Sequence, residues 1–266
     1  MIMSEITIPN VVVGRNYDSS VPRPPVCATP WSGSWIAHKV LRPYNRLRHA
    51  LLRRHAEARS RAVRNIQTLA ASLTDIDEHL ETMYVEGVLC RPKLIVELGV
   101  RGGTSTAVFE QVAELCGSTI ISGDIDDCSR ASQNPRWHFF RDDDVHLAEM
   151  FPQYCRELGL TPEVDLLFID TSHYYDHTVE EIRAWFPLLS GRAKVMFHDT
   201  NLRNVGPRKD GCFQLGWDNQ RGVIRAIEEY LGIQINEREQ YSDAISGWLL
   251  RHWPNCNGFT ILDRIA

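Results

Sequence analysis

The sequence lacks any uninterrupted apolar stretch that approaches the roughly 20 residues needed to span a bilayer. Its N-terminus, MIMSEITIPN, also lacks the basic region followed by an apolar region that is typical of a secretory signal. We therefore expect a cytoplasmic protein with no membrane partner.

The sequence also lacks a cysteine framework. Its seven cysteines are odd in number, scattered along the chain, and include no C-x-x-C pair. Neither a set of disulfides nor a structural zinc site is indicated by such a pattern. We expect free thiols in a reducing compartment.

An excess of positive charge is missing as well. The chain has 29 Lys and Arg residues against 34 Asp and Glu residues, a formal net charge of −5. A basic field of the kind that attracts nucleic acid is therefore absent, and we expect no nucleic-acid partner. The composition, 43% hydrophobic and 24% charged, is that of a globular protein with a sizeable core.

Basic residues are concentrated near the N-terminus, where residues 39–64 hold nine Lys and Arg residues and one acid. Apolar residues recur there at steps of three, four or seven from Leu47 to Met83, which predicts one long helix or two in tandem. Thr74 and Asp77 resemble a capping box, which favours a break near residue 73. The basic face fits either a solvated outer surface or an acidic partner.

The first 36 residues are rich in Pro, Ser and Val and predict an extended arm. Trp31 and Trp35 suggest that this arm docks on another surface, such as a second subunit, so we expect a homo-oligomer. The predicted organisation is an arm over 1–36, a helical extension over 37–89 and a catalytic domain over 90–266.

From residue 93 short apolar runs alternate with helical patterns. The candidate strands are 93–98, 118–124, 137–140, 164–170 and 193–199, and the candidate helices are 104–116, 145–158, 176–189 and 219–231. Strands without polar alternation, separated by helices, predict an α/β fold with a doubly wound, mostly parallel sheet. After Leu231, IQINER together with either SGWLLRH or GFTILDR predicts an antiparallel hairpin at one edge of this sheet.

Acids and glycines follow the first three predicted strands. A glycine-rich turn comes after the first strand, in Glu97-Leu98-Gly99-Val100-Arg101-Gly102-Gly103, but its spacing is not the G-x-G-x-x-G of dinucleotide-binding proteins. Asp124 ends the second strand, where an acid can accept hydrogen bonds from ribose hydroxyls. Asp142 and Asp143 follow the third strand, where a carboxylate could accept from an adenine amino group. Together these features predict a site for a nucleoside without a pyrophosphate.

The fourth and fifth predicted strands end in FIDTSH and MFHDT. Adjacent parallel strands bring their carboxyl ends together, so Asp170, His198 and Asp199 are predicted to converge on a divalent cation such as Mg²⁺. The alternative is that Asp199 caps a turn and His198 is a packed strand-end residue. His173, three residues after Asp170, is the candidate general base, because an imidazole titrates near neutral pH. His177 is expected to lie behind this site or at the surface.

The segment 200–218 is long for a connection between a strand and a helix and is rich in Gly and Asn. It follows the proposed ligands directly, so it is expected to form part of an acceptor pocket with Phe213 and Trp217 as apolar walls. The alternative is a surface insertion without such a role.

Four segments resemble class I S-adenosylmethionine-dependent methyltransferases, in particular those that methylate sugars and natural products. These are ELGVRGGTS, the acid in ISGDID, the stretch FIDTSHYYDHTVEEIRAWFPLLSGRAKVMFHDT, and GVIRAIEEYL. The resemblance covers about residues 90–266 and implies a Rossmann-like fold.

The resemblance also implies residue roles. Glu97 and Gly99 would lie at the methionine end of S-adenosylmethionine, Asp124 at the ribose and Asp142 or Asp143 at the adenine. The full predicted cofactor set is Glu97, Gly99, Gly103, Thr104, Ser105, Asp124, Asp142 and Asp143. Mg²⁺ or another divalent cation would be held by Asp170, His198 and Asp199, although the strand-end pair begins with His where relatives have an acid. His173 stands at the offset of the catalytic base.

These inferences predict an O-methyltransferase that acts on a hydroxyl of a sugar or glycosylated natural product in a biosynthetic pathway. A nicotinamide-dependent dehydrogenase is an alternative that would need the missing G-x-G-x-x-G turn. A noncatalytic cofactor-binding scaffold is a second alternative, which would bind the cofactor without turnover.

Overall fold

The computed structural model describes residues 57–71, 74–202, 205–207, 213–215 and 220–265. Contacts divide the chain into Met1–Leu52 and Arg53–Ala266, and all described residues belong to the second unit. The predicted arm over 1–36, with Trp31 and Trp35, lies outside the described residues, and so does most of the basic segment.

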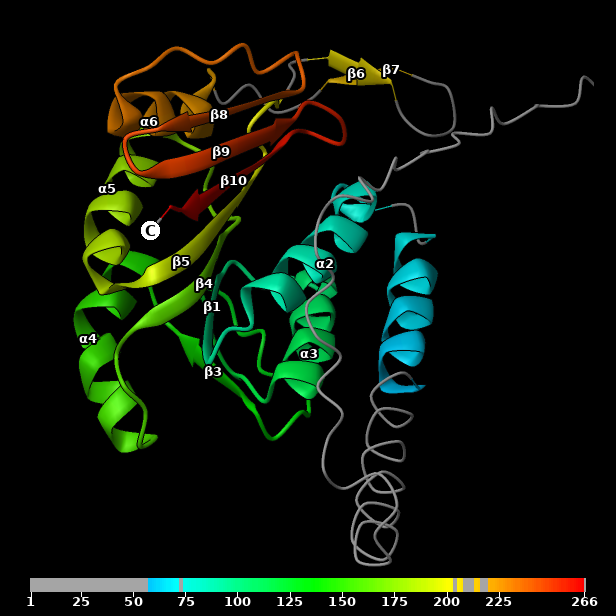
Figure 1. The fold of residues 1–266 in the computed structure, drawn as a ribbon, viewed down its shortest axis with the longest axis vertical. Coiled ribbons are helices and arrows are strands. Elements are labelled where there is room, and N and C mark those ends of the chain that lie inside the picture. The colour runs from blue at the N-terminus through cyan, green and yellow to red at the C-terminus, as the bar shows by residue number, and fades with distance from the viewer. Residues whose placement is uncertain (1–56, 72–73, 203–204, 208–212, 216–219, 266) are drawn as a thin grey trace, which may run out of the picture. The chain divides into compact units, whose positions relative to one another are not determined.

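The described chain is built around one sheet of eight strands (Figure 1). Its strands are β1 (Leu94–Leu98), β2 (Thr119–Asp124), β3 (Trp137–Arg141), β4 (Val164–Ile169), β5 (Leu189–His198), β8 (Tyr241–Ile245), β9 (Trp248–Trp253) and β10 (Phe259–Arg264). The order across the sheet is β3-β2-β1-β4-β5-β10-β9-β8. The first five strands are mutually parallel and the last three pair antiparallel. The predicted doubly wound α/β fold is confirmed.

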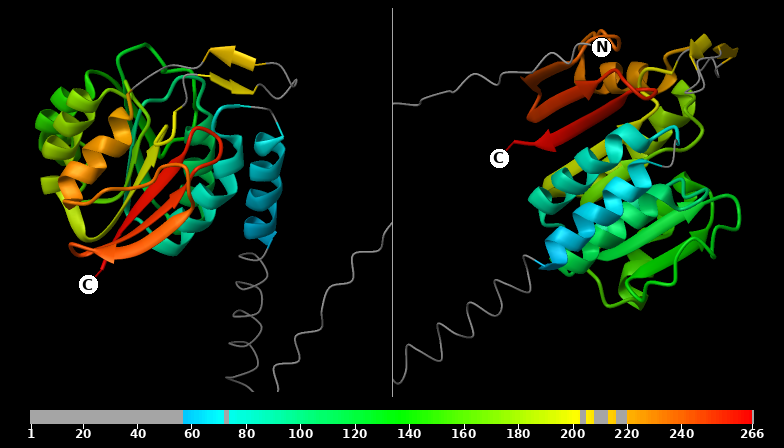
Figure 2. Two further views of the ribbon diagram at one scale, coloured as in Figure 1. Left: turned by 90° about the horizontal axis from the view of Figure 1, so that it is seen from above. Right: turned by 90° about the vertical axis from the view of Figure 1, so that its right-hand side faces the viewer.

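Helices cover both faces of this sheet (Figures 1 and 2). On one face lie α2 (Leu80–Cys90) and α3 (Thr104–Cys116), and on the other lie α4 (Asp144–Glu157), α5 (Tyr175–Trp185) and α6 (Gly222–Leu231). Successive residues of β1 alternate between the two cores, since Leu94, Val96 and Leu98 face α4, α5 and α6 whereas Ile95 faces α2 and α3. Burial on both sides explains why the parallel strands are apolar throughout.

The N-terminal helical pattern is broken as expected. Residues 57–70 are helical, and one side of this segment places Ala62 and Ile66 in the core beside α2 and α3. The next helix, η1 (Asp77–His79), is a short 3₁₀ turn that leads into α2. Its N-cap is Ile76, without a side-chain cap, so the expected Thr74 capping box is wrong although the break itself is confirmed.

Two boundaries in the second half differ from the sequence prediction. The helix expected over 176–189 ends at Trp185, because Phe186-Pro187-Leu188 form the 3₁₀ turn η2 and β5 already begins at Leu189. The segment IQINER, expected to be a strand, is not one. Both alternative segments for its partner are strands: SGWLLRH contains the start of β9 and GFTILDR contains β10. The C-terminal hairpin is therefore a three-stranded antiparallel extension in which β10 pairs directly with β5.

Two short strands, β6 (Val205–Pro207) and β7 (Phe213–Leu215), form a separate antiparallel pair within the predicted acceptor segment.

The five described cysteines are free thiols, as expected. Among the described helices, none combines the length and the apolar character required to cross a bilayer.

The carboxyl ends of β1 and β4 meet at Gly99. Its φ is +86°, and a Cβ at this position would lie 2.0 Å from the backbone oxygen of Asp170. The Asp170 amide donates to Leu98 O at 2.9 Å, and the Gly99 amide donates to Gly123 O at 2.9 Å, so three strand ends are joined here. A residue with a side chain has no room at this junction.

We expect Gly99→Ala to lower the free energy of unfolding by at least about 2 kcal/mol, because the new methyl group meets backbone and the φ angle is unfavourable for alanine. Gly102→Ala is the matched control, since its Cβ would have nothing within 4 Å, and we expect a change below about 0.5 kcal/mol. Denaturant unfolding of both variants measures this difference. Equal stabilities would contradict the close approach of the two strand ends.

Candidate functional site

A cavity of about 270 Å³ lies at the carboxyl ends of β1, β2 and β4. The chain winds outward from β1 through β2 to β3 and then returns to the other side of β1 as β4, and ligands of α/β proteins bind at such a reversal of strand order. The lining residues are Gly99, Arg101, Gly123, Asp124, Ile125, Asp126, Asp142, Asp143, Asp144, Asp170, Thr171, Ser172 and His177. Six of these are acids, so the cavity suits a ligand that carries positive charge.

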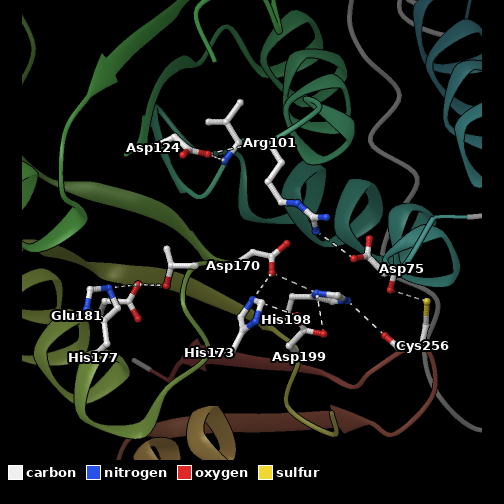
Figure 3. Close-up of polar contacts among 12 residues, drawn as sticks. Asp75, Arg101, Asp124, Asp170, His173, His177, Glu181, His198, Asp199 and Cys256 are labelled. Atoms are coloured by element: carbon white, nitrogen blue, oxygen red, sulfur yellow. Dashed lines mark hydrogen bonds and ion pairs between the residues drawn. The ribbon is translucent and has the colours of Figure 1, made fainter. Parts of the chain in front are cut away.

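Asp124 binds the glycine-rich turn. Its Oδ2 accepts from the amides of Val100 at 2.8 Å and Arg101 at 3.0 Å (Figure 3). Its Oδ1 accepts from the amide of Asp126 at 2.9 Å. Burial alone would raise the pKa of Asp124, but these hydrogen bonds outweigh it and hold the pKa below its usual value.

Glu97 lies beneath the turn and does not line the cavity. It shares a face of β1 with Ile95 and is 0% exposed. Hydroxyl groups surround its carboxylate, with Ser105 Oγ at 2.6 Å, Thr106 Oγ1 at 2.9 Å and Ser122 Oγ at 2.6 Å. Burial raises the pKa of Glu97 to about 7, although these hydrogen bonds act in the opposite direction. Glu97 thus links β1, β2 and α3 through hydrogen bonds. It does not face the cavity, where its expected role at the cofactor would place it.

The remaining predicted cofactor residues lie around the same turn. Gly103, with φ +78°, is the N-cap of α3, and Thr104 is the first residue of that helix. The Asp143 carboxylate caps α4 by accepting from Val145 N and His146 N. Asp142 pairs with His146 Nδ1 at 2.8 Å. Asp142 and Asp143 line the cavity, whereas Thr104 and Ser105 do not.

A cluster of two carboxylates and two imidazoles adjoins the cavity at Asp170 (Figure 3). His173 Nε2 lies 3.1 Å from Asp170 Oδ1 and 3.0 Å from Asp199 Oδ2. His198 Nδ1 lies 3.3 Å from Asp170 Oδ1 and 3.5 Å from Asp199 Oδ1. The structure therefore brings together all four residues that the sequence predicts for the cation and the base.

The positions of the two histidines differ from the sequence prediction, which places His198 among the cation ligands and His173 beside them. Ligand atoms of Asp170, His173 and Asp199 all lie within 4.8 Å of one another, which makes His173 part of the compact ligand set. His198, with a side chain 1% exposed, lies deeper and has its Nε2 3.3 Å from the carbonyl oxygen of Cys256.

Electrostatics fix the charge states of this cluster. Burial opposes charge on Asp170, but the positive charge of His198 and the hydrogen bond from His173 outweigh burial and hold the pKa of Asp170 far below its usual value. Burial likewise opposes charge on His198, and the charges of Asp170 and Asp199 raise its pKa well above the ordinary value. His198 is therefore an imidazolium between two carboxylates.

The backbone at this cluster is constrained by close packing. His173 and Asp199 have φ angles of +62° and +54°, which cost about 1–3 kcal/mol each in residues other than glycine. A Cβ at Gly222 would lie 2.3 Å from His173 O, and a Cβ at Gly258 would lie 2.3 Å from Asn201 N. The two glycines allow α6 and the turn before β10 to press against the two strained segments.

Sequence reasoning missed two further features. His79 in η1 stacks on Phe259 with ring centroids 4.9 Å apart and lies edge-on to His198 at 5.9 Å. Burial, and then the charge of His198, lower the pKa of His79 to about 4, so it is neutral. His177, expected only behind the site, lines the cavity and pairs with Asp144 Oδ2 at 2.9 Å. No sequence pattern marks either contact, because each joins segments far apart in the chain.

The expected apolar walls of an acceptor pocket are not covered by the structure. Trp217 and the side chain of Phe213 lie outside the described residues. Their role stays a prediction.

Glu97 makes the stability of the protein depend on pH. Between its ordinary pKa of 4.5 and its folded value of about 7, the unfolded chain releases a proton that the folded chain retains. The contribution of Glu97 to the free energy of unfolding therefore falls as the pH rises from 4.5 to about 7, and it is constant above that range. We expect the unfolding free energy of the wild type, relative to Glu97→Gln, to fall by up to about 3 kcal/mol across the window.

Denaturant unfolding at several pH values measures this difference. Glu114→Gln is the control, because Glu114 is exposed on the same helix that contacts Glu97. Profiles for the wild type and Glu97→Gln that run parallel at all pH values would show that Glu97 does not retain a proton in the folded state.

Comparison with known proteins identifies the central segment. Residues 96–200 match a family described as a methyltransferase domain. Uncharacterized protein y4gI from Sinorhizobium fredii (strain NBRC 101917 / NGR234) is 28% identical over 136 residues, which cover 44% of this chain and 14% of that protein.

Solved structures share the fold. SAH-bound methyltransferase PaMTH1 from Podospora anserina matches with a TM-score of 0.50 and 17% identity, over 77% of this chain and 88% of PaMTH1. MycE methyltransferase from the mycinamycin biosynthetic pathway, in complex with Mg and SAH, matches with a TM-score of 0.46 and 16% identity, over 71% of this chain and 49% of MycE. The chain thus spans about half of MycE and a small part of y4gI.

The family match begins in β1 and ends just after β5. It contains every residue that lines the cavity and all four members of the acid and imidazole cluster. Residues 96–200 match a methyltransferase-domain family, in agreement with the sequence resemblance.

Proposed function

We propose that this protein transfers a methyl group from S-adenosylmethionine to a hydroxyl group of a small molecule, with a divalent cation held by the carboxylates of Asp170 and Asp199 and with His173 beside it as the proton acceptor. This proposal rests on the location of Asp170. This residue lines the cavity and also belongs to the cluster with His173 and Asp199. A donor bound in the cavity would therefore end beside the groups that can hold an acceptor.

The cavity has the charge that such a donor requires. S-adenosylmethionine would supply a methyl group on a positively charged sulfonium, and the cavity is lined by six acids. Gly99 leaves the junction of β1 and β4 free of side chains, and Asp124 holds the turn in place through its amides. Ile125, 69% exposed, offers an apolar surface at the same wall.

The cluster has donors that fit a divalent cation. Asp199 Oδ1 is buried and has no hydrogen-bond partner among the described residues, its nearest charged neighbour being His198 Nδ1 at 3.5 Å. Two carboxylates suit Mg²⁺ or Mn²⁺. When bound, the cation would supply a Lewis acid that lowers the pKa of the acceptor hydroxyl.

The residues of the cluster then have distinct tasks. Asp170 and Asp199 form the part of the site that binds the acceptor, and they orient the acceptor hydroxyl toward the cavity. His198 supports both carboxylates from the buried side and does not need to reach the acceptor. His173 takes the proton that the acceptor hydroxyl loses as its oxygen bonds to the methyl carbon, while the bond from that carbon to the donor's sulfur breaks and releases the demethylated product.

The acceptor class stays a prediction from the sequence resemblance. It is a hydroxyl of a sugar or glycosylated natural product, and a panel of such compounds with radiolabelled donor would identify it. Assembly into a homo-oligomer also stays a prediction, which sedimentation analysis would test.

We expect the protein to bind S-adenosylmethionine and its demethylated product in isothermal titration. Asp124→Asn should weaken this binding about tenfold or more, since its amide group repels the turn amides and removes an acceptor for the ribose. Asp127→Asn is the matched control on the same loop, because Asp127 is exposed and lies outside the cavity. Unchanged affinity in Asp124→Asn, or binding of a nicotinamide dinucleotide instead, would contradict the proposal.

Methyl transfer should stop on chelation and return with Mg²⁺ or Mn²⁺. His173→Asn, chosen because asparagine tolerates the φ of +62°, should lower kcat about a hundredfold or more through loss of the proton acceptor. Its affinity for the demethylated product should be unchanged, since His173 does not line the cavity.

Activity that survives thorough chelation would contradict the cation. A His173→Asn enzyme with a normal kcat and a raised cation requirement would show that His173 is a ligand only. Cofactor binding without turnover for any acceptor in the panel would favour the noncatalytic scaffold.

A further inference from the structure

A second group of ligand-type side chains lies at the cavity, separate from the cluster at Asp199. Asp144 is the first residue of α4, and His177 and Glu181 lie one turn apart on α5, so they share a face of that helix. One ligand atom from each of the three lies within 4.8 Å of the others. Figure 3 shows His177 and Glu181 beside one another, away from His198.

Two carboxylate oxygens in this group are buried and have no hydrogen-bond partner within the described part of the chain. They are Asp144 Oδ1 and Glu181 Oε2, in residues that are 8% and 0% exposed. The other oxygens are in use, since Asp144 Oδ2 pairs with His177 and Glu181 Oε1 accepts from Thr171 Oγ1 at 2.5 Å. A buried carboxylate oxygen without a partner is costly, so these two atoms point to a positive group between the helices.

The charges lead to the same requirement. The two acids, Asp144 and Glu181, face one imidazole, that of His177. The cavity wall has one other basic residue, Arg101, and its guanidinium pairs with Asp75, which is not part of this group. Asp143, which precedes Asp144, adds a further carboxylate that is taken up in capping α4. The group therefore has an excess of negative charge that either a cation or a shared proton must balance.

The distances suit a metal ion. His177 Nε2 lies 2.9 Å from Asp144 Oδ2 and 3.9 Å from Glu181 Oε1. Ligands that bind one ion at about 2.1 Å are separated from each other by about 3 to 3.5 Å. Small side-chain rotations would therefore bring the three ligand atoms to coordination distance without movement of α4 or α5.

We propose that Asp144, His177 and Glu181 form a second divalent-cation site, for an ion that accepts both nitrogen and oxygen ligands, such as Mn²⁺, Co²⁺ or Zn²⁺. The ion joins the start of α4 to α5 and supports the wall of the cavity formed by Asp144 and His177. This site does not depend on the proposed methyl transfer or on a cation at Asp170.

The test is a count of bound ions by equilibrium dialysis of the metal-free protein against Mn²⁺ or Zn²⁺, followed by elemental analysis. Glu181→Gln should bind one ion fewer than the wild type, and Glu180→Gln, which changes the exposed neighbour on α5, should bind the same number as the wild type. Asp199→Asn should keep the ion that Glu181→Gln loses. The difference between wild type and Glu181→Gln is thus one ion whether or not the Asp170 cluster is loaded.

A second variant guards against misfolding at the buried glutamate. His177→Gln alters a partly exposed side chain and should weaken Co²⁺ binding at this site at least about tenfold, with an altered visible spectrum because the nitrogen ligand is lost. Thermal unfolding in metal-free buffer should show that both variants are folded. An equal ion count in Glu181→Gln and wild type overturns the proposal, as does a folded wild type that takes up no ion, since Asp144 and Glu181 then share a proton instead.

Discussion

The close approach of β1 and β4 at Gly99 determines where every other part of the site lies. At this point the Gly99 backbone lies against the carbonyl of Asp170, and no side chain fits between them. β2 and β4 lie on opposite sides of β1, because the chain reverses its winding direction between β3 and β4, and the cavity lies at this reversal beside Asp124. Asp170, at the end of β4, is consequently shared by the cavity and by the cluster with His173 and Asp199.

The site places many carboxylates in a small volume, and each is stabilised in a different way. Backbone amides hold Asp124, hydroxyl groups hold the fully buried Glu97, and imidazoles hold Asp170. Amides and imidazolium favour the charged carboxylate, whereas the hydroxyl set around Glu97 only partly offsets burial and its pKa rises to about 7. The kind of donor therefore decides which acids are ionised and able to attract a cationic ligand.

Segments outside residues 96–200 pack against the acid and imidazole cluster. The 3₁₀ turn η1 brings His79 and the ring of Phe259 against His198. Gly222 at the start of α6 and Gly258 before β10 allow backbone to pack against His173 and Asn201. These N-terminal and C-terminal segments thus pack beside two strained residues, His173 and Asp199.

The sequence by itself determined the order of strands and helices and the edge at which the polar residues gather. Apolar runs fix which strands are buried on both faces, and parallel strands place Asp124, Asp170 and Asp199 at one edge because their carboxyl ends coincide. Local pattern also explains the error at the C-terminal edge, since IQINER has strand-like composition but connects α6 to β8 without joining the sheet. Only the tertiary structure decided the role of each polar group. Glu97 faces α3 rather than the cavity, His173 rather than His198 joins the compact ligand set, and His177 meets Asp144, because these contacts depend on packing between segments distant in the sequence.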